Sequence, residues 1–244
     1  MNAAIIGATG LIGQCLLLNI LADNRYQQVV VIGRRSPKLE ASTPGIEKLI
    51  FVETQLNQLT ELSLPASIDQ AFCCLGTTIK QAGNQENFIK VDHTAVIDFA
   101  KLVIKYQAQT GVELLVVTAL DANEKSTMFY NRVKGEVQRD LRLLPLKQLT
   151  FFQPSLLLGE RAHQRTLEDI GQKFFAIASG IFIGPLAKYK PITGKLVADN
   201  MLAVAVKDQS GSGSGSSSGT DSGSQLDNLT IRIIDNKQMH RLVN

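Results

Sequence analysis

Three glycines near the N-terminus have the spacing of a phosphate-binding turn. Gly7, Gly10 and Gly13 lie between the apolar runs Ala3–Ile6 and Leu11–Leu18, which predict a buried strand and a buried helix. Glycine lets such a turn approach a pyrophosphate closely, and the amide groups at the start of the helix then face the anion. Glycines also punctuate ordinary turns, so the prediction depends on the flanking strand and helix. The residues of this turn that we expect to bind a dinucleotide are Gly7, Thr9, Gly10, Leu11, Ile12 and Gly13.

Two arginines follow the second predicted strand, Gln28–Ile32. In an NAD site, an acidic residue about 20 positions past the glycine turn holds the ribose 2′-hydroxyl. This chain has Gly33, Arg34 and Arg35 at that place, with no carboxylate beside them. A guanidinium suits a 2′-phosphate by its charge and its bidentate geometry. The pattern therefore favours NADP(H) over NAD(H), with a solvated surface side chain as the alternative reading for Arg35.

Tyr130 and Lys134 could carry acid–base chemistry. They are four residues apart on a helix predicted over about Ser126–Leu143, so they share one face of it. A tyrosine, with a reference pKa of about 10, is a poor acid at neutral pH unless a nearby ammonium stabilises its phenolate. The same ammonium can hold ribose hydroxyls. An ordinary amphipathic pair is the alternative, but this helix follows the predicted strand Glu113–Val117 and so starts near the sheet edge where ligands bind.

Predicted strands alternate with predicted helices along the chain. This alternation implies right-handed crossovers and a parallel sheet with helices on both faces. The sequence therefore predicts the α/β class, with a Rossmann-like, doubly wound parallel sheet. The strands are expected at residues 3–6, 28–32, 48–52, 70–75, 113–117, 149–152 and 229–234. The helices are expected at about residues 11–18, 84–107, 126–143, 173–183 and 196–206, with a short last helix capped by Asp235.

The predicted domain organisation has three parts. Residues 1–208 form the NAD(P)-binding domain, with a small substrate-side region from about residue 155. Residues 209–225 are almost all Ser and Gly and predict a flexible tether, natural or engineered. Residues 226–244 are expected to return a strand to the sheet edge, because Ile231 and Ile233 need cover.

Composition narrows the class of partner. A net charge of +3 is too modest to argue for nucleic acid, and no run reaches the length of a membrane span. The three cysteines, Cys15, Cys73 and Cys74, have neither a zinc spacing nor a disulfide framework, so we expect free buried thiols and no metal. The chain begins directly with a predicted strand, so no signal peptide is expected. A cytoplasmic protein, monomeric or homodimeric and acting on a small molecule of unspecified identity, is the working expectation.

Five pieces in order resemble the short-chain dehydrogenase/reductase superfamily, and within it the atypical branch that contains TIP30 and bacterial relatives. The resemblance covers nearly the whole chain up to about residue 207. The pieces are Gly7-Ala8-Thr9-Gly10, Gly33-Arg34-Arg35, Cys74-Leu75-Gly76-Thr77-Thr78, Val91-Asp92 and Tyr130 with Val133-Lys134-Gly135-Glu136-Val137.

The resemblance implies roles for individual residues. Tyr130 would be the general acid in carbonyl reduction and Lys134 its electrostatic helper. The residues that would contact the cofactor beyond the glycine turn are Arg34, Arg35, Leu75, Gly76, Thr77, Lys134 and Pro154, with residues 155–157 bordering the nicotinamide.

The chain departs from the superfamily at the third catalytic position. The superfamily places a serine just after the fifth strand, where this chain has Val117, Thr118 and Ala119. Thr118 offers a hydroxyl and is the candidate, although its β-branched side chain limits its rotamers. The alternative is that Thr118 lies one position before the usual serine and that Ala119 occupies the serine's place. Gln153 also stands where related chains often have arginine.

Three functions remain open from the sequence. The first is an NADP(H)-dependent oxidoreductase that reduces a small carbonyl with Tyr130 as proton donor. The second is an NADPH-binding regulatory protein with little or no catalysis, since a fold can keep a cofactor site after losing its chemistry. A sugar-nucleotide epimerase is weaker, because the C-terminal part is short for a nucleotide-sugar lobe.

Overall fold

The computed structural model describes residues 1–158, 184–210 and 229–242. The helix expected over residues 173–183 and nearly all of the Ser/Gly-rich segment lie outside these ranges. In the described part, parallel strands form a seven-stranded sheet in the order β3-β2-β1-β4-β5-β6-β9. The strands are β1 (Asn2–Ile6), β2 (Gln28–Gly33), β3 (Leu49–Glu53), β4 (Gln70–Cys73), β5 (Glu113–Val117), β6 (Gln148–Gln153) and β9 (Thr230–Asp235).

The strand order reverses between β1 and β4, which makes the sheet doubly wound, as expected. The chain runs outward from β1 to β3, returns to β4 beside β1 and continues to the other edge. At such a reversal the loops that leave two neighbouring strands diverge and open a crevice at their carboxyl ends. A second, two-stranded parallel sheet pairs β7 (Leu157–Leu158) with β8 (Ile192–Thr193).

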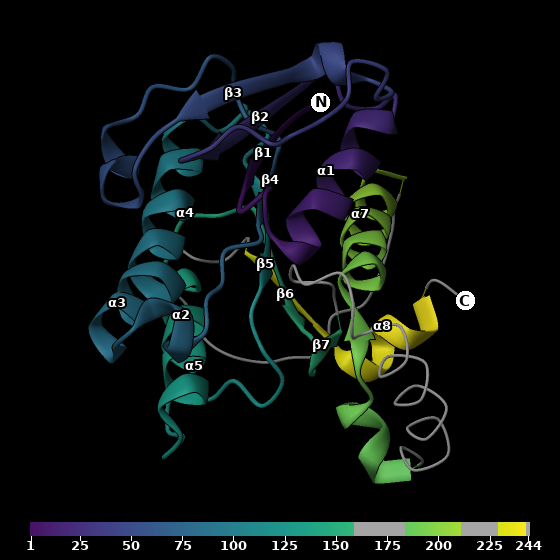
Figure 1. The fold of residues 1–244 in the computed structure, drawn as a ribbon. Helices are drawn as coiled ribbons and strands as arrows, with labels where there is room; N and C mark the ends of the chain where they lie inside the picture. The colour runs from purple at the N-terminus through teal and green to yellow at the C-terminus, as the bar shows by residue number, and fades with distance from the viewer. Residues whose placement is uncertain (159–183, 211–228, 243–244) are drawn as a thin grey trace.

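Helices cover both faces of the sheet (Figure 1). One face carries α4 and α5 with the short α2 and α3, and the other carries α1, α7 and α8. Their bounds are α1 (Leu11–Ala22), α2 (Ile79–Ala82), α3 (Gln85–Ile89), α4 (Ala95–Lys105), α5 (Phe129–Leu141), α7 (Gly194–Ser210) and α8 (Asn236–Leu242).

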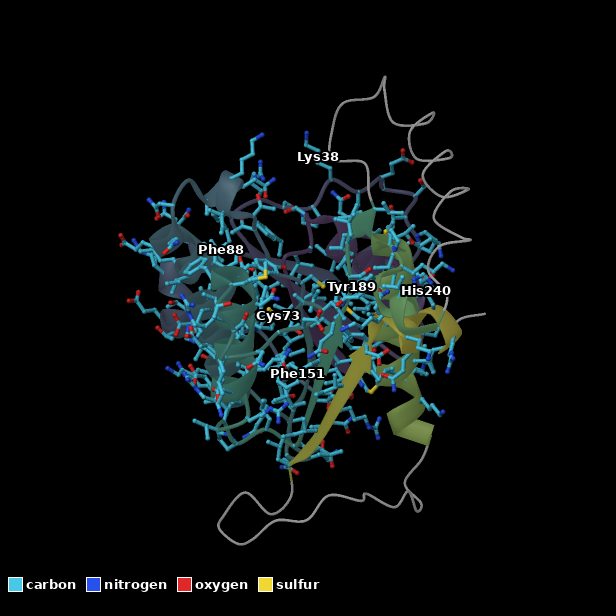
Figure 2. All side chains as sticks on the ribbon, turned by 90° about the horizontal axis from the view of Figure 1, so that it is seen from below. Lys38, Cys73, Phe88, Phe151, Tyr189 and His240 are labelled. Carbon is cyan, nitrogen blue, oxygen red and sulfur yellow. The ribbon has the colours of Figure 1, made fainter. Side chains whose placement is uncertain are left out.

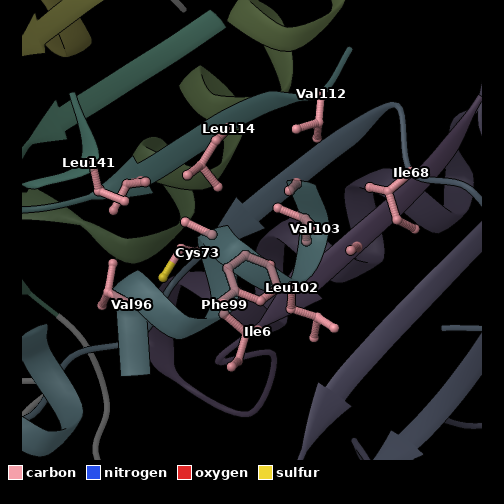
Figure 3. Close-up of a cluster of buried hydrophobic side chains, with 14 of the residues drawn as sticks. Ile6, Ile68, Cys73, Val96, Phe99, Leu102, Val103, Val112, Leu114 and Leu141 are labelled. Carbon is pink, nitrogen blue, oxygen red and sulfur yellow. The ribbon is translucent and has the colours of Figure 1, made fainter. Parts of the chain in front are cut away.

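Two apolar cores, one on each face, hold these layers together. The inner strands are apolar along their length because both of their faces are covered. On the α4 side, Phe99, Leu102 and Val103 pack against side chains from the sheet such as Ile6 and Leu114 (Figure 3). The opposite core joins the buried faces of α1 and α7 to the sheet.

The single long helix expected over residues 84–107 is instead two α-helices joined by a π-helical turn, Lys90–Thr94. An extra residue in such a turn rotates the side chains around it relative to a regular helix. Val91, expected on the apolar face, is half-exposed, whereas Asp92 beside it is fully buried.

Two smaller expectations are corrected. The last strand does rejoin the sheet, but Ile231 and Ile233 remain 38% and 42% exposed, so burial of these side chains is not what holds it. Of the three free cysteines, Cys73 is buried, whereas Cys15 and Cys74 are half-buried.

Candidate functional site

Two adjoining hollows form one cleft along the carboxyl edge of the sheet, where β1 and β4 lie side by side. Their volumes are about 680 and 500 Å³. Both are lined by the glycine turn before α1 and by the loop after β4. The lining residues that they share are Gly10, Cys74, Leu75, Gly76 and Thr77. We call the hollow that contains Arg34 the adenine-side hollow and the one that contains Tyr130 the substrate-side hollow.

The glycine turn is tight enough to explain each of its glycines. Gly7 has a φ of +82°, and a Cβ there would lie 2.6 Å from the backbone of Cys74. A Cβ on Gly10 would lie 3.2 Å from the carbonyl oxygen of Gly7, and the amide of Gly10 donates to that carbonyl at 2.9 Å and closes the turn. A Cβ on Gly13 would lie 2.2 Å from the Gly7 carbonyl oxygen, so Gly13 allows α1 to pack on the turn and lies behind the cleft rather than lining it.

The start of α1 has the features of an anion site. Its N-cap is Gly10, which supplies no side-chain hydrogen bond, and its first turn contains no acidic residue. The first amide groups of a helix have no partner inside the helix. These donors therefore face the cleft between its two hollows, where a pyrophosphate would bridge the two halves of a dinucleotide.

The adenine-side hollow is positively charged. Arg34 and Arg35 are exposed and line it, and no carboxylate is among its lining residues. Within the described part of the chain, neither guanidinium forms an ion pair or a hydrogen bond. A Cβ on Gly33 would meet nothing within 4 Å, so the floor beside the arginines is open.

Lys134 lies in the substrate-side hollow and forms a buried ion pair that the sequence did not reveal. Its Nζ lies 2.7 Å from Oδ1 of Asp92, with 4% of the lysine side chain and none of the aspartate side chain exposed. The other carboxylate oxygen accepts the amide of Thr77 at 2.8 Å. Burial alone lowers the pKa of Lys134, but the charge of Asp92, then that of Tyr130, and the hydrogen bond to Asp92 reverse this, and the net pKa is raised.

Asp92 lies in the π-helical turn, four and seven residues before Val96 and Phe99 on the buried face of α4, and is itself buried. The only available signal was an acidic residue inside an otherwise apolar helical pattern, next to Val91. Asp92 thereby ties α5 to the loop after β4, two elements that border the cleft.

Tyr130 stands at the mouth of the substrate-side hollow, one turn before Lys134 on α5. Its ring packs at a tilt against Phe88 of α3, with 5.6 Å between ring centroids, and the residue is 36% exposed. Figure 2 labels Phe88 on the α3–α5 side of the sheet and Tyr189 on the α7–α8 side. Tyr189 lines the same hollow, so the hollow receives residues from both layers.

Thr118 also lines the substrate-side hollow, but its hydroxyl is engaged inside the protein. The hydroxyl donates to the carbonyl of Phe152 at 3.3 Å and accepts the amide of Gln138 at 2.9 Å. The side chain is 4% exposed. Its one proton is thus directed at the backbone rather than into the cleft, where the neighbouring Ala119 carries no polar group.

Apart from Gly13, the structure brings every candidate residue to this cleft. The members that line the adenine-side hollow are Gly7, Thr9, Gly10, Arg34, Arg35, Leu75, Gly76 and Thr77. Those that line the substrate-side hollow are Gly10, Leu11, Ile12, Leu75, Gly76, Thr77, Thr118, Tyr130, Lys134 and Pro154. The glycine cradle and the uncapped helix start fit a dinucleotide lying across both hollows.

Comparison with known proteins identifies related chains. The protein named FMP52, mitochondrial, of Eremothecium gossypii is 31% identical over 220 residues, which are 85% of this chain and 90% of that protein. Protein HTATIP2 of Rattus norvegicus is 34% identical over 173 residues, 70% of this chain and 69% of that protein. A short-chain type dehydrogenase/reductase from Mycobacterium ulcerans shares the fold at 13% identity, with a TM-score of 0.63 over 98% of this chain and 90% of that one. No family model matches the chain.

These relatives correct the expectation of a cytoplasmic protein. The FMP52 proteins of three fungi, 31–33% identical to this chain, carry the word mitochondrial in their names. The expectation rested on free cysteines and on the start of the chain, neither of which identifies a compartment. In the described ranges, no helix is long and apolar enough to cross a membrane. The chain shares its Rossmann-like fold with a short-chain type dehydrogenase/reductase. By identity and coverage, the chain belongs to the family of FMP52 and HTATIP2.

Proposed function

We propose that the chain is an NADP(H)-dependent oxidoreductase that reduces a small carbonyl compound with Tyr130 as the proton donor. The observation that carries this proposal is the order of groups along one cleft. Two arginines that have no partner within the described part of the chain line one end, the glycine turn lies in the middle, and Tyr130 lies with Lys134 at the other end. This is the order in which the 2′-phosphate, the pyrophosphate and the nicotinamide occur along NADP(H).

The preference for NADP(H) rests on charge. Solved structures of this fold are described with NAD⁺ or with NADP⁺ bound, so the fold itself accepts either cofactor. In this chain Arg34 and Arg35 line the adenine-side hollow, and no carboxylate that could hold a free 2′-hydroxyl is among the described residues that line it. A guanidinium–phosphate hydrogen bond contributes about 1.5–3 kcal/mol, enough to set a preference of at least tenfold.

The chemistry follows from the residues at the substrate end. A reduced nicotinamide, when bound, supplies the hydride that reaches the carbonyl carbon. Tyr130 gives its hydroxyl proton to the carbonyl oxygen, so the carbonyl becomes an alcohol, and the phenolate left behind regains a proton from solvent. Lys134 stabilises that phenolate by its positive charge, and Asp92 keeps the ammonium in place.

A cofactor titration followed by cofactor fluorescence tests the first half of the proposal. NADPH should bind at least tenfold more tightly than NADH, and Arg34→Ala should remove most of that difference by weakening NADPH alone. Lys38→Ala, an exposed cation four positions away that does not line the cleft, is the matched control and should change neither affinity. Equal affinities for the two cofactors in the unaltered protein would refute the role of the arginines.

Turnover tests the second half. Tyr130→Phe should abolish NADPH oxidation with any aldehyde or ketone that the unaltered protein reduces, and NADPH affinity should stay within about threefold. Full turnover by Tyr130→Phe would remove the tyrosine from the mechanism.

One observation favours the second candidate, an NADPH-binding regulatory protein. The proton of Thr118 is directed at the carbonyl of Phe152, and Ala119 offers no hydroxyl, so the third group expected to bind the substrate carbonyl is missing from the cleft. Membership in the family of HTATIP2 fits this alternative as well. A broad panel of carbonyl compounds separates the two candidates, since a regulator would bind NADPH tightly and oxidise it with none of them.

A further inference from the structure

The substrate end of the cleft is walled mainly by apolar side chains. It is bordered by the loop after β5, the loop after β6 and the end of the 3-10 helix Gly184–Tyr189. Leu156 is 66% exposed, and Leu157 and Tyr189 are 37% and 41% exposed, so an apolar surface faces the entrance. The other apolar residues that line this end are Val117, Ala119, Leu120 and Pro154.

The polar groups at this end already have partners in the protein. The hydroxyl of Ser155 donates to the carbonyl of Lys190 at 2.6 Å. The carboxylate of Asp121 accepts Nζ of Lys188 at 3.2 Å and the hydroxyl of Tyr189 at 3.3 Å. Together with the engaged hydroxyl of Thr118, these bonds leave none of these described side chains aimed at an ionised or polyhydroxylated ligand.

Charge is balanced at the same place. Asp92 is neutralised by Lys134, and Asp121 by Lys188. A charged substrate would therefore lose its water without gaining a partner among the described residues at this end, which is costly in a partly enclosed site. Among the described residues that line this end, the hydroxyl of Tyr130 forms no hydrogen bond and is the polar anchor that remains.

We infer that the substrate is an uncharged, mainly apolar aldehyde or ketone whose carbonyl is its only strongly polar group. This inference rests on the proposed reduction at Tyr130 and adds the chemical class of the compound that is reduced. The carbonyl oxygen meets the Tyr130 hydroxyl, and the hydrocarbon part lies against Leu156, Leu157 and the Tyr189 ring. Each methylene that leaves water for this wall should improve recognition by about fourfold.

Straight-chain aldehydes from butanal to decanal, compared with 6-oxohexanoate, test the inference through NADPH oxidation. We expect kcat/KM to rise about fourfold per methylene until the hollow is filled. Hexanal should exceed 6-oxohexanoate, which has the same chain length and carries a carboxylate, by at least a hundredfold. A flat series, or a preference for 6-oxohexanoate, would overturn the inference.

A binding measurement separates failure of this inference from failure of the proposed function. The matching 1-alkanols cannot be reduced by NADPH, so their binding to the NADPH-loaded protein is measured by the change in cofactor fluorescence. Alkanol affinity that rises with chain length, in the absence of any aldehyde turnover, would refute the proposed reduction and support the apolar site. Affinity independent of chain length would overturn the inference even if aldehydes are reduced.

Two matched variants locate the apolar surface. Leu156→Asp places a carboxylate at the entrance and should reduce the gain per methylene to less than twofold. Leu143→Asp is the control, because Leu143 is equally exposed, at 66%, and does not line the cleft. Equal chain-length dependence in the two variants would place the hydrocarbon part elsewhere and overturn the inference.

Discussion

The ion pair between Lys134 and Asp92 determines how much of the lysine's charge is available to Tyr130. A carboxylate 2.7 Å from the ammonium offsets part of its field, so the pair stabilises a phenolate less than a free ammonium would. In return, the carboxylate keeps a buried lysine charged, which burial alone would oppose. Asp92 thus weakens the electric field of the Lys134 ammonium at Tyr130, but it fixes the position of the ammonium and keeps it charged.

Asp92→Asn should reveal this ion pair as a pH-dependent loss of stability. Removing one partner of a buried pair leaves the other charge without compensation, and we expect the free energy of unfolding to fall by about 3 kcal/mol at pH 7. The folded-state pKa of Lys134 is raised above its usual 10.5, so the contribution of the pair is full below pH 10.5 and is lost as the pH rises through the folded pKa. In the variant, the charge of Asp92 no longer opposes the lowering of that pKa by burial, so the difference between the two proteins should shrink at alkaline pH.

Urea denaturation from pH 7 to pH 10 measures this difference. Asp92→Asn combined with Lys134→Met removes both charges and should recover most of the lost stability. A loss below about 1 kcal/mol for the single variant would mean that the pair is not buried in solution.

Thr118→Val should separate a structural hydroxyl from a catalytic one. The change leaves the amide of Gln138 without its acceptor, so the free energy of unfolding should fall by about 1–3 kcal/mol. The kcat/KM for an aldehyde that the protein reduces should change by less than threefold, because the hydroxyl proton does not reach the cleft.

Ala119→Ser should raise kcat/KM about fivefold, since one new hydrogen bond to the carbonyl contributes about 1 kcal/mol. A hundredfold loss of kcat/KM in Thr118→Val, with NADPH affinity retained, would show instead that the Thr118 hydroxyl binds the substrate.

At the scale of elements, the position of Tyr130 and Lys134 in the cleft depends on close packing between α5 and the loop that precedes it. A Cβ on Gly135 would lie 2.1 Å from the amide nitrogen of Glu124 and 2.2 Å from the carbonyl carbon of Asn123. The amide of Asn123 donates to the carbonyl of Asn131 at 3.0 Å and fastens the same loop to the helix. The glycine after Lys134 therefore sets the distance between α5 and the loop that leads from β5.

Gly135→Ala tests this close approach. The clash is with backbone, so either the loop or α5 must move, and we expect a loss of about 2 kcal/mol or more in the free energy of unfolding. If the protein reduces aldehydes, the rate of turnover should also fall in this variant, since Tyr130 lies on α5. Gly33→Ala is the control for stability, because a Cβ there meets nothing within 4 Å. Thermal unfolding of the two variants gives the comparison, and equal melting temperatures would contradict the role of Gly135.

The elements that the sequence predicted well are those with a simple period. After their first residues, Asn2 and Glu113, β1 and β5 are apolar because they lie between two helical layers. The glycine turn after β1 follows from the strand and helix around it. The π-helical turn could not be predicted, because one extra residue in a turn of helix leaves no mark on the composition of the helix. The direction of the Thr118 hydroxyl and the clearance at Gly135 depend on Phe152 and Asn123, which only the folded chain brings near.

At the scale of the whole molecule, the last described segment closes the fold and supports the substrate end of the cleft. β9 pairs along β6, and α8 buries Met239 against the core that α1 and α7 share. Asn236, at the start of α8, accepts the amide of Ser155 at 3.1 Å and donates to the carbonyl of Lys190 at 2.7 Å. A segment from the far end of the chain thus holds two loops that border the cleft.

If these contacts hold the C-terminal segment in place, the folded protein should keep the segment bound even after the chain is cut between it and the rest of the protein. A protease site placed among residues 211–225 and cut in the folded protein should leave residues 229–242 attached through size-exclusion chromatography, because β9 and α8 have main-chain and buried side-chain partners of their own. NADPH affinity should stay within about threefold. The same cut combined with Asn236→Ala and Met239→Ala should release the segment, since it removes the hydrogen bonds to Ser155 and Lys190 and the apolar anchor. Release from the singly cut, otherwise unaltered protein would show instead that chain connectivity holds the last strand in the sheet.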